Sequence, residues 1–372
     1  MNQLSNSPLD ALRSQQWFKL ICGASYQHLP SIRNLALVYT LAGADCIDMA
    51  ADPAVIRAAR EGIAVAHRFM GLADRSPENI TYAAPWVMVS FNDGEDPHFR
   101  KALFEPQDCL SGCDRPCMDI CPTQAIQFRG GSDRNIHSPM ENGYNGIVDS
   151  LCYGCGRCLP LCPVQIIHTR EQVYAPETIH REPIDAIEIH TQPGRVREFG
   201  QLWQRLGGLI PQLKLVAVSF PDCEDLRDYL TALLACMHPL PQQLIWQADG
   251  RPMSGDIGDG ATRAAVLLAK KVVGMQLPFG FVQVAGGTNA STVAKLQAAN
   301  VRPAGIAYGS YARKLVADIL ERSSSNYLEA DSLLLQQAVS KAKCLVGQIK
   351  HSQSASDLQD APSTFSSIPL KP

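Results

Sequence analysis

The sequence lacks the features that mark nucleic-acid-binding, membrane and exported proteins. Its 36 acidic and 33 basic residues leave a formal net charge of −3, which indicates no basic surface for nucleic acid or an anionic membrane. No apolar run approaches the roughly 20 residues that a membrane-spanning helix needs. Residues 1–16 are polar and contain no apolar core of a signal peptide. We therefore expect a cytoplasmic protein without a membrane span.

Cysteine, in contrast, is abundant and unevenly placed, since eight of the 13 cysteines lie between residues 109 and 162. Without an export signal, such clustering indicates metal binding rather than disulfides. The later run reads Cys152-x2-Cys155-x2-Cys158-x3-Cys162-Pro163 and matches the bacterial ferredoxin motif C-x2-C-x2-C-x3-C-P. Tetrahedral zinc also suits paired C-x2-C units. A proline after the fourth cysteine of both runs argues against zinc.

The earlier run is spaced more widely and reads Cys109-x3-Cys113-x3-Cys117-x3-Cys121-Pro122. A helix would place these cysteines on one face. Gly112 and Pro116 lie within the span, however, and proline breaks a helix, so a loop is favoured. Because of the wider spacing, we expect the first cluster to be looser, more exposed or more easily oxidised than the second.

Together the two runs predict two [4Fe–4S] clusters. In two-cluster ferredoxins the fourth cysteine of a run ligates the cluster of the other run. The first cluster is therefore assigned to Cys109, Cys113, Cys117 and Cys162. The second cluster is assigned to Cys121, Cys152, Cys155 and Cys158. Residues 130–149 between the runs are rich in turn formers and are a candidate partner surface, although a solvated loop is the simpler explanation.

Apolar runs alternate with segments of helical periodicity on both sides of the cysteine-rich segment. Strands are expected at 17–23, 46–50, 86–91, 186–190, 213–220, 243–247, 279–285 and 304–308. Eight β/α units, typically about 250 residues, make a TIM barrel. We therefore predict a TIM-barrel-like (β/α)8 domain with a two-cluster bacterial-ferredoxin module inserted after the third strand. An open doubly wound parallel sheet with the same module is the alternative.

The domain boundaries follow from this alternation. The predicted segments are a flexible leader over 1–15, the first part of the barrel over 16–107, the ferredoxin-like module over 108–170, the second part of the barrel over 171–348 and a Ser-rich, disordered tail over 349–372.

The turns after the last two strands are candidate binding sites, because active sites of TIM barrels lie at the C-terminal ends of the strands. Gly286, Gly287 and Thr288 follow the seventh strand, and Gly309 and Ser310 follow the eighth. Gly-rich turns at these positions often hold phosphate. These five residues are therefore a candidate anion or cofactor-binding site, although the same glycines are explained by the turns alone.

Other polar residues lie on the strands themselves. Lys19 and Asp48 lie where flavin-dependent barrels place polar groups, which is a weak basis for a flavin. His190 follows Glu188 by two residues, on the same face of a strand, and is the best single candidate for a functional histidine. Cys22, at a strand end, is expected to be a buried structural cysteine, with a reactive thiol as the alternative.

Segments that flank the cysteine runs carry a resemblance to a known family. They are residues 17–25 (WFKLICGAS), 42–48 (AGADCID) and 246–256 (WQADGRPMSGD). The cysteine runs lie between these segments. Over roughly residues 15–345, the chain resembles the cyanobacterial light-dependent period family. The resemblance implies an iron–sulfur protein whose cluster ligands are the eight cysteines, and it implies no catalytic residue in the barrel.

The same resemblance implies a redox sensor that relays photosynthetic redox state to the circadian clock and modulates its period. It implies the histidine kinase CikA and the clock protein KaiA as partners. An iron–sulfur oxidoreductase, with or without a flavin, that uses the barrel mouth as its active site is the alternative. A plain electron carrier would not need the barrel. We expect a sensor rather than an enzyme.

Overall fold

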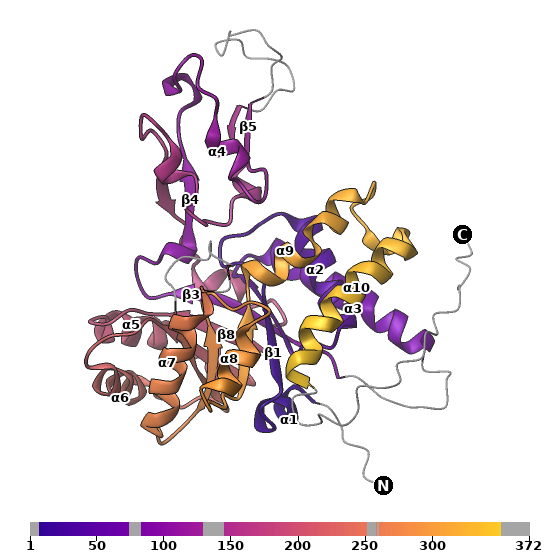
Figure 1. Cartoon of the computed structure of the whole chain (residues 1–372). Helices are drawn as coiled ribbons and strands as arrows, with labels where there is room; N and C mark the ends of the chain where they lie inside the picture. The colour runs from indigo at the N-terminus through magenta and orange to yellow at the C-terminus, as the bar shows by residue number, and fades with distance from the viewer. Residues whose placement is uncertain (1–6, 74–82, 129–144, 251–257, 259, 351–372) are drawn as a thin grey trace.

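A closed barrel of parallel strands forms the centre of the molecule (Figure 1). The computed structural model describes residues 7–73, 83–128, 145–250, 258 and 260–350. The barrel strands are β1 (Trp17–Ile21), β2 (Cys46–Ala50), β3 (Trp86–Asn92), β8 (Ala186–His190), β9 (Leu215–Phe220), β10 (Leu244–Asp249), β11 (Phe281–Ala285) and β12 (Gly305–Tyr308). β1 pairs in parallel with both β2 and β12. This closure confirms the predicted TIM barrel and excludes the open doubly wound sheet.

Helices surround the barrel on its outside (Figure 1). They are α2 (Leu29–Leu41), α3 (Pro53–Ala73), α5 (Val196–Leu206), α6 (Leu226–Cys236), α7 (Thr262–Met275), α8 (Thr292–Ala298), α9 (Ser310–Arg322) and α10 (Ser332–Lys350). α3 begins as its sequence predicts, since Asp52 Oδ1 accepts the Ala54 N–H at 2.8 Å and Pro53 is the first helical residue. Among the described helices, none combines the length and apolar character needed to cross a membrane.

The predicted leader over residues 1–15 contains a helix instead, because α1 (Pro8–Arg13) has both a cap and a buried face. The Ser7 hydroxyl accepts the Asp10 N–H at the start of α1. Leu12 is fully buried and packs with Trp17 and other residues from the N-terminal ends of the barrel strands. α1 therefore closes the end of the barrel opposite the inserted module. The tail was predicted over 349–372, but residues 349 and 350 still belong to α10. Residues 1–6 and 351–372 lie outside the described residues.

The inserted module stands on the C-terminal face of the barrel, between β3 and β8 (Figure 1). An antiparallel stem of β4 (Arg100–Leu103) and β7 (His168–Glu171) connects it to the barrel. The module starts at this stem rather than at residue 108, because β4 pairs with β7 across the whole cysteine-rich segment. Between β3 and β8, the described residues contain no α-helix longer than α4 (Pro116–Asp119), so the module, inserted after the third strand as predicted, stands in place of the third barrel helix.

A second, smaller antiparallel pair lies farther from the barrel, formed by β5 (Ile126–Phe128) and β6 (Asn145–Ile147). The module also has its own small apolar core, which includes Phe104, Ile126 and Ile167 together with several cysteines. The β5–β6 pair, this apolar core and both cysteine runs therefore belong to one compact unit. Most of the excursion predicted over residues 130–149 lies outside the described residues, which resume at residue 145.

Candidate iron–sulfur sites and the barrel mouth

The structure brings Cys109, Cys113, Cys117 and Cys162 together around one cavity of the module. We call these four residues the first cysteine set. The run does not form one helix, since α4 begins at Pro116. Burial raises the pKa of the Cys117 thiol, and the Cys109 and Cys113 thiols raise it further. The arrangement follows the crossed ferredoxin pattern, in which a cysteine of the later run joins three of the earlier run.

Cys121, Cys152, Cys155 and Cys158, here called the second cysteine set, also lie close to one another. Burial raises the pKa of the Cys158 thiol to about 12, and the Cys155, Cys152 and Cys121 thiols contribute to that shift. Thiolates this close repel one another, so without a bound cation the thiols stay protonated. The Ala125 N–H donates to Cys121 Sγ at 3.2 Å, a type of hydrogen bond that stabilises a sulfur ligand of a cluster.

Each set therefore offers four thiols, which is the donor set of a [4Fe–4S] cluster. All 13 cysteines are free, so no disulfide competes for these thiols. The iron ligation itself stays a prediction. Outside the module, burial raises the pKa of the Cys22 thiol to about 12, although the Arg313 guanidinium lowers it. Cys22 is fully buried and protonated at neutral pH, which agrees with the prediction of a buried structural cysteine and not with the alternative of a reactive thiol.

The segment that precedes Cys152 is tied to the barrel by a buried lysine. Lys101 Nζ donates to Gln27 Oε1 at 2.6 Å and to the backbone oxygen and Oδ2 of Asp149, both at 2.8 Å. Lys101 is fully buried, so these acceptors replace the water that it loses. The Gln27 N–H also donates to the Ser150 oxygen at 3.2 Å. The second cysteine set therefore begins at a point held against the barrel.

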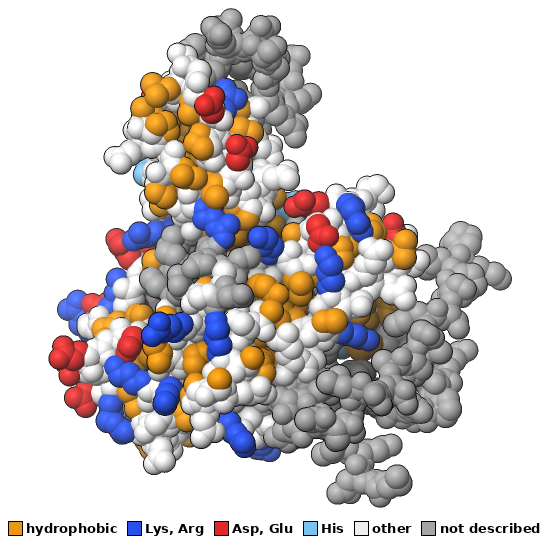
Figure 2. Space-filling model, viewed as in Figure 1, with side chains coloured by type: hydrophobic (Ala, Val, Ile, Leu, Met, Phe, Trp, Pro, Cys, Tyr) orange, Lys and Arg blue, Asp and Glu red, His pale blue; other side chains and the backbone are white. Residues whose placement is uncertain are grey.

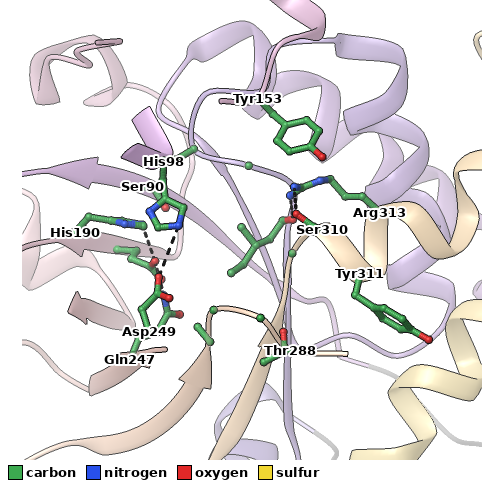
Figure 3. Close-up of a pocket in the computed structure, with 18 residues that line it drawn as sticks. Ser90, His98, Tyr153, His190, Gln247, Asp249, Thr288, Ser310, Tyr311 and Arg313 are labelled. Atoms are coloured by element: carbon green, nitrogen blue, oxygen red, sulfur yellow. Dashed lines mark hydrogen bonds and ion pairs between the residues drawn. The ribbon is translucent and has the colours of Figure 1, made fainter. Parts of the chain in front are cut away.

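Tyr153, between Cys152 and Cys155, brings the second cysteine set to the barrel mouth. Its ring lies 4.3 Å from the Arg313 guanidinium carbon, and Figure 3 shows both residues beside the same cavity. The next residue, Gly154, has φ +74°, and a Cβ atom there would lie 2.1 Å from the Arg100 carbonyl oxygen. The chain can pass this close to the stem only with glycine at this position.

The cavity at the barrel mouth is lined by all five residues of the predicted anion site, which are Gly286, Gly287, Thr288, Gly309 and Ser310. It measures about 60 Å³, room for a few water-sized groups. The φ of Gly287 is +82°, and a Cβ atom there would lie 2.6 Å from the Ala261 oxygen. Backbone geometry alone therefore requires this glycine. Anion binding at the site stays a prediction.

Beneath the cavity, Lys19 is fully buried among acidic side chains inside the barrel. Its Nζ lies 3.2 Å from Asp48 Oδ2 and also pairs with Glu188. Burial lowers the pKa of Lys19, but Asp48 and Glu188 raise it by more, so Lys19 is charged. Ser90 Oγ donates to Asp48 Oδ1 at 2.8 Å, and Gln247 Nε2 donates to Glu188 Oε1 at 2.7 Å. The polar residues predicted on β1, β2 and β8 thus form one network.

This network continues to two histidines, one of which the sequence pattern did not single out. His190 Nε2 lies 2.8 Å from Glu188 Oε1, and His190 Nδ1 lies 3.7 Å from Asp96 Oδ2. His98 Nδ1 lies 2.9 Å from Asp96 Oδ1 (Figure 3 shows the two imidazoles side by side). Asp96 and His98 escaped prediction because they follow the third strand in an irregular segment. The signal available was the Asp-Pro-His sequence at residues 96–98, separated from the end of that strand by three residues.

The fold and the two cysteine sets define the class, a TIM-barrel protein with an inserted iron–sulfur-binding module of ferredoxin type. Two family models match the chain: the LdpA Fe-S cluster-binding domain at residues 109–173 and the Light dependent period A C-terminal domain at residues 178–348. The protein Light dependent period A of Synechococcus elongatus is 48% identical over 357 residues, which cover 92% of this chain and 94% of that protein. The chain belongs to the light dependent period A family.

Other similarities are confined to the module or to the fold. The uncharacterized ferredoxin-like protein YdhX of Escherichia coli K12 is 34% identical over 80 residues, covering 22% of this chain and 29% of that protein. The crystal structure of the YdjI aldolase of Escherichia coli K12 aligns over 95% of this chain and 97% of its own, with 10% identity and a TM-score of 0.40. The strand pairing, and not this low score, establishes the barrel.

Proposed function

We propose that this chain is a redox sensor whose two [4Fe–4S] clusters, bound by the two cysteine sets, report photosynthetic redox state to the circadian clock and modulate its period. The grouping of the thiols into two sets of four supports the clusters. The name of the Synechococcus relative, Light dependent period A, supports a role in period control.

The contact between Tyr153 and Arg313 carries this proposal, because it connects the loop of the second cysteine set to the barrel mouth. The first cysteine set lies beside the exposed apolar side chains Leu110, Leu161 and Val164. Figure 2 shows hydrophobic side chains over this module in one view. Electrons enter at the first cluster, pass to the second, and alter the charge that faces Tyr153 and the mouth.

The partners belong to the same proposal. We infer that the sensor acts in the cytoplasm on clock input proteins, namely the histidine kinase CikA and the clock protein KaiA, which the family resemblance implies. A change of cluster charge needs to shift partner affinity by only about 1 to 3 kcal/mol to alter binding roughly 5- to 150-fold.

The test compares the two redox states of one preparation. The protein is purified without oxygen, divided into oxidised and dithionite-reduced samples, and titrated with CikA and with KaiA separately. We expect at least one partner to bind with a dissociation constant that differs about 5-fold or more between the states.

A cluster-deficient variant is the control for this experiment. In Cys155→Ser the second cluster loses a ligand, so the difference between the two states should disappear. Equal affinities in both states of the intact protein, for both partners, would contradict the sensor proposal.

The buried network under the mouth favours a second candidate, an iron–sulfur oxidoreductase that acts on a small substrate. Lys19, Asp48, Glu188 and His190 are titratable groups linked in series, which is the type of arrangement found in acid–base catalysis. A cavity of about 60 Å³ in the described part of the mouth suits a small substrate better than a flavin. Denaturation of the purified protein checks this point, because a released yellow chromophore would establish a flavin.

A further inference from the structure

Three side chains at the barrel mouth, Asp96, His98 and His190, each offer one ligand atom, and these atoms all lie within 4.8 Å of one another. Asp96 and His98 come from the segment after β3, and His190 is the last residue of β8. Two imidazoles and one carboxylate form the donor set of many divalent transition-metal sites that keep open positions. Metal–ligand bonds of about 2.0 to 2.2 Å need only small side-chain shifts from this arrangement.

The second nitrogen of each imidazole faces another carboxylate. The Nδ1 atoms of both histidines are directed at Asp96, at 2.9 Å for His98 and 3.7 Å for His190. On the other side of each ring, His190 Nε2 lies 2.8 Å from Glu188 Oε1, and His98 Nε2 lies 3.8 Å from Asp249 Oδ2. A metal-binding histidine nearly always donates its other N–H to a carboxylate, which orients the ring and makes the ligand more basic.

The charge of the network also calls for a cation. Lys19 Nζ and the imidazoles of His98 and His190 contact three buried carboxylates, those of Asp48, Asp96 and Glu188. With neutral imidazoles, Lys19 alone does not balance these three carboxylates, and buried charge without compensation is costly. A divalent ion supplies two positive charges. Protonation of both imidazoles is the competing way to supply them.

We propose that Asp96, His98 and His190 bind a divalent transition-metal ion at the barrel mouth, with open coordination positions on the side of the cavity. His98 and His190 line this cavity directly. The proposal rests on the geometry of the mouth and is independent of the redox function proposed above.

The same cavity indicates the class of ligand that would complete the coordination. Figure 3 shows His98 and His190 on one side of the cavity and Ser310 and Arg313 on the other. The Arg313 guanidinium adds a positive group opposite the metal. A cavity of about 60 Å³ between two cations fits a small oxyanion, such as a carboxylate or a phosphate group, bound to the metal.

Manganese titration tests the site with the clusters in place. The chain is purified without oxygen, treated briefly with a chelator, checked for retained iron, and titrated with Mn²⁺ while the room-temperature paramagnetic resonance signal of free Mn²⁺ is recorded. We expect one Mn²⁺ per chain to bind in saturable fashion. His98→Ala and His190→Ala should each weaken binding about 10-fold or more, and Mn²⁺ should raise the melting temperature of the wild type.

His67→Ala is the matched control, because His67 is an exposed histidine on α3 and its removal should leave Mn²⁺ binding unchanged. His98 is more accessible than His190, so His98→Ala keeps the test valid if His190→Ala fails to fold. Folding of each variant is checked by circular dichroism and iron content. Absence of saturable Mn²⁺ binding in the wild type, or equal binding by wild type and His98→Ala, would overturn the proposal and leave protonated imidazoles as the balancing charge.

Discussion

The Tyr153 ring lies over the Arg313 guanidinium, 4.3 Å from ring centroid to guanidinium carbon, and so joins the iron–sulfur module to the barrel mouth. Arg313 is itself held in place, because its Nη1 donates to the Ile21 oxygen at 2.9 Å and to the Cys22 oxygen at 3.1 Å. A structural change at the second cysteine set would therefore act on a guanidinium that is hydrogen-bonded to the end of β1. This contact directly connects the module to the barrel mouth.

Replacement of Tyr153 by leucine should uncouple the module from the mouth. The cation–π contact is worth about 0.5 to 2 kcal/mol, so the variant should keep its iron and fold. In the wild type, cluster reduction should change hydrogen exchange of the backbone amides at the start of α9. Tyr153→Leu should lose this response and Tyr153→Phe, which keeps the ring, should retain it. A response of the leucine variant equal to that of the wild type would exclude this route.

Gly154→Ala should destroy the second cluster. The φ of +74° is unfavourable for alanine, and the new Cβ atom would lie 2.1 Å from the Arg100 carbonyl oxygen. The loop must then shift and carry its cysteines with it, so bound iron should fall to about half of the wild-type content. Gly112→Ala is the matched control, because Gly112 has φ +84° but nothing within 4 Å of a Cβ atom. Equal iron in both variants would contradict the role assigned to this close approach.

Double substitutions can test the crossed assignment of the cysteines. Cys109 and Cys162 are assigned to the same cluster, so Cys109→Ser with Cys162→Ser should lose no more iron than either change alone. Cys109 and Cys121 come from one run but are assigned to different clusters, so that pair should lose the iron of both. Iron content and paramagnetic resonance of the reduced protein measure the outcome. The opposite pattern would show that each run binds its own cluster.

The parts of the fold that the sequence predicts are those set by short-range pattern. Apolar runs followed by helical periodicity located the barrel strands, and the spacing around Cys152 located the module. The stem of β4 and β7 was missed because it pairs residues about 70 positions apart, and short strands have weak local signals.

The same distinction holds for the candidate site. His190 and Glu188 were found together because they share a strand face. Asp96 and His98 were missed because only the pairing of β3 with β8, across the inserted module, brings the segment after β3 against the end of β8. A site whose residues come from a strand end and an irregular segment far apart in the chain produces little local sequence pattern. The cluster cysteines are recognisable because their spacing is itself the signal.

The ion pair between Lys350 and Asp45 joins the end of α10 to the barrel. Lys350 Nζ lies 2.7 Å from Asp45 Oδ1 and 2.6 Å from Oδ2. Burial raises the pKa of Asp45 to about 6, although the Lys350 ammonium and the Phe18 N–H lower it. Because this folded-state pKa exceeds the ordinary value of 3.8, the folded state binds the proton more tightly. The resulting stabilisation is complete below about pH 4 and is lost as pH rises through about 6.

Lys350→Met should therefore destabilise the protein more at neutral than at acidic pH. At about pH 7.5 the variant leaves a buried carboxylate without its ammonium partner, which should cost about 2 kcal/mol, or roughly 3 °C in melting temperature. At about pH 5 a protonated Asp45 needs no ammonium partner, so the loss should be much smaller. Lys341→Met is the control, because Lys341 pairs with exposed Asp318 and its removal should cost little at either pH. A pH-independent loss in Lys350→Met would mean that Asp45 stays ionised throughout this range in the folded protein.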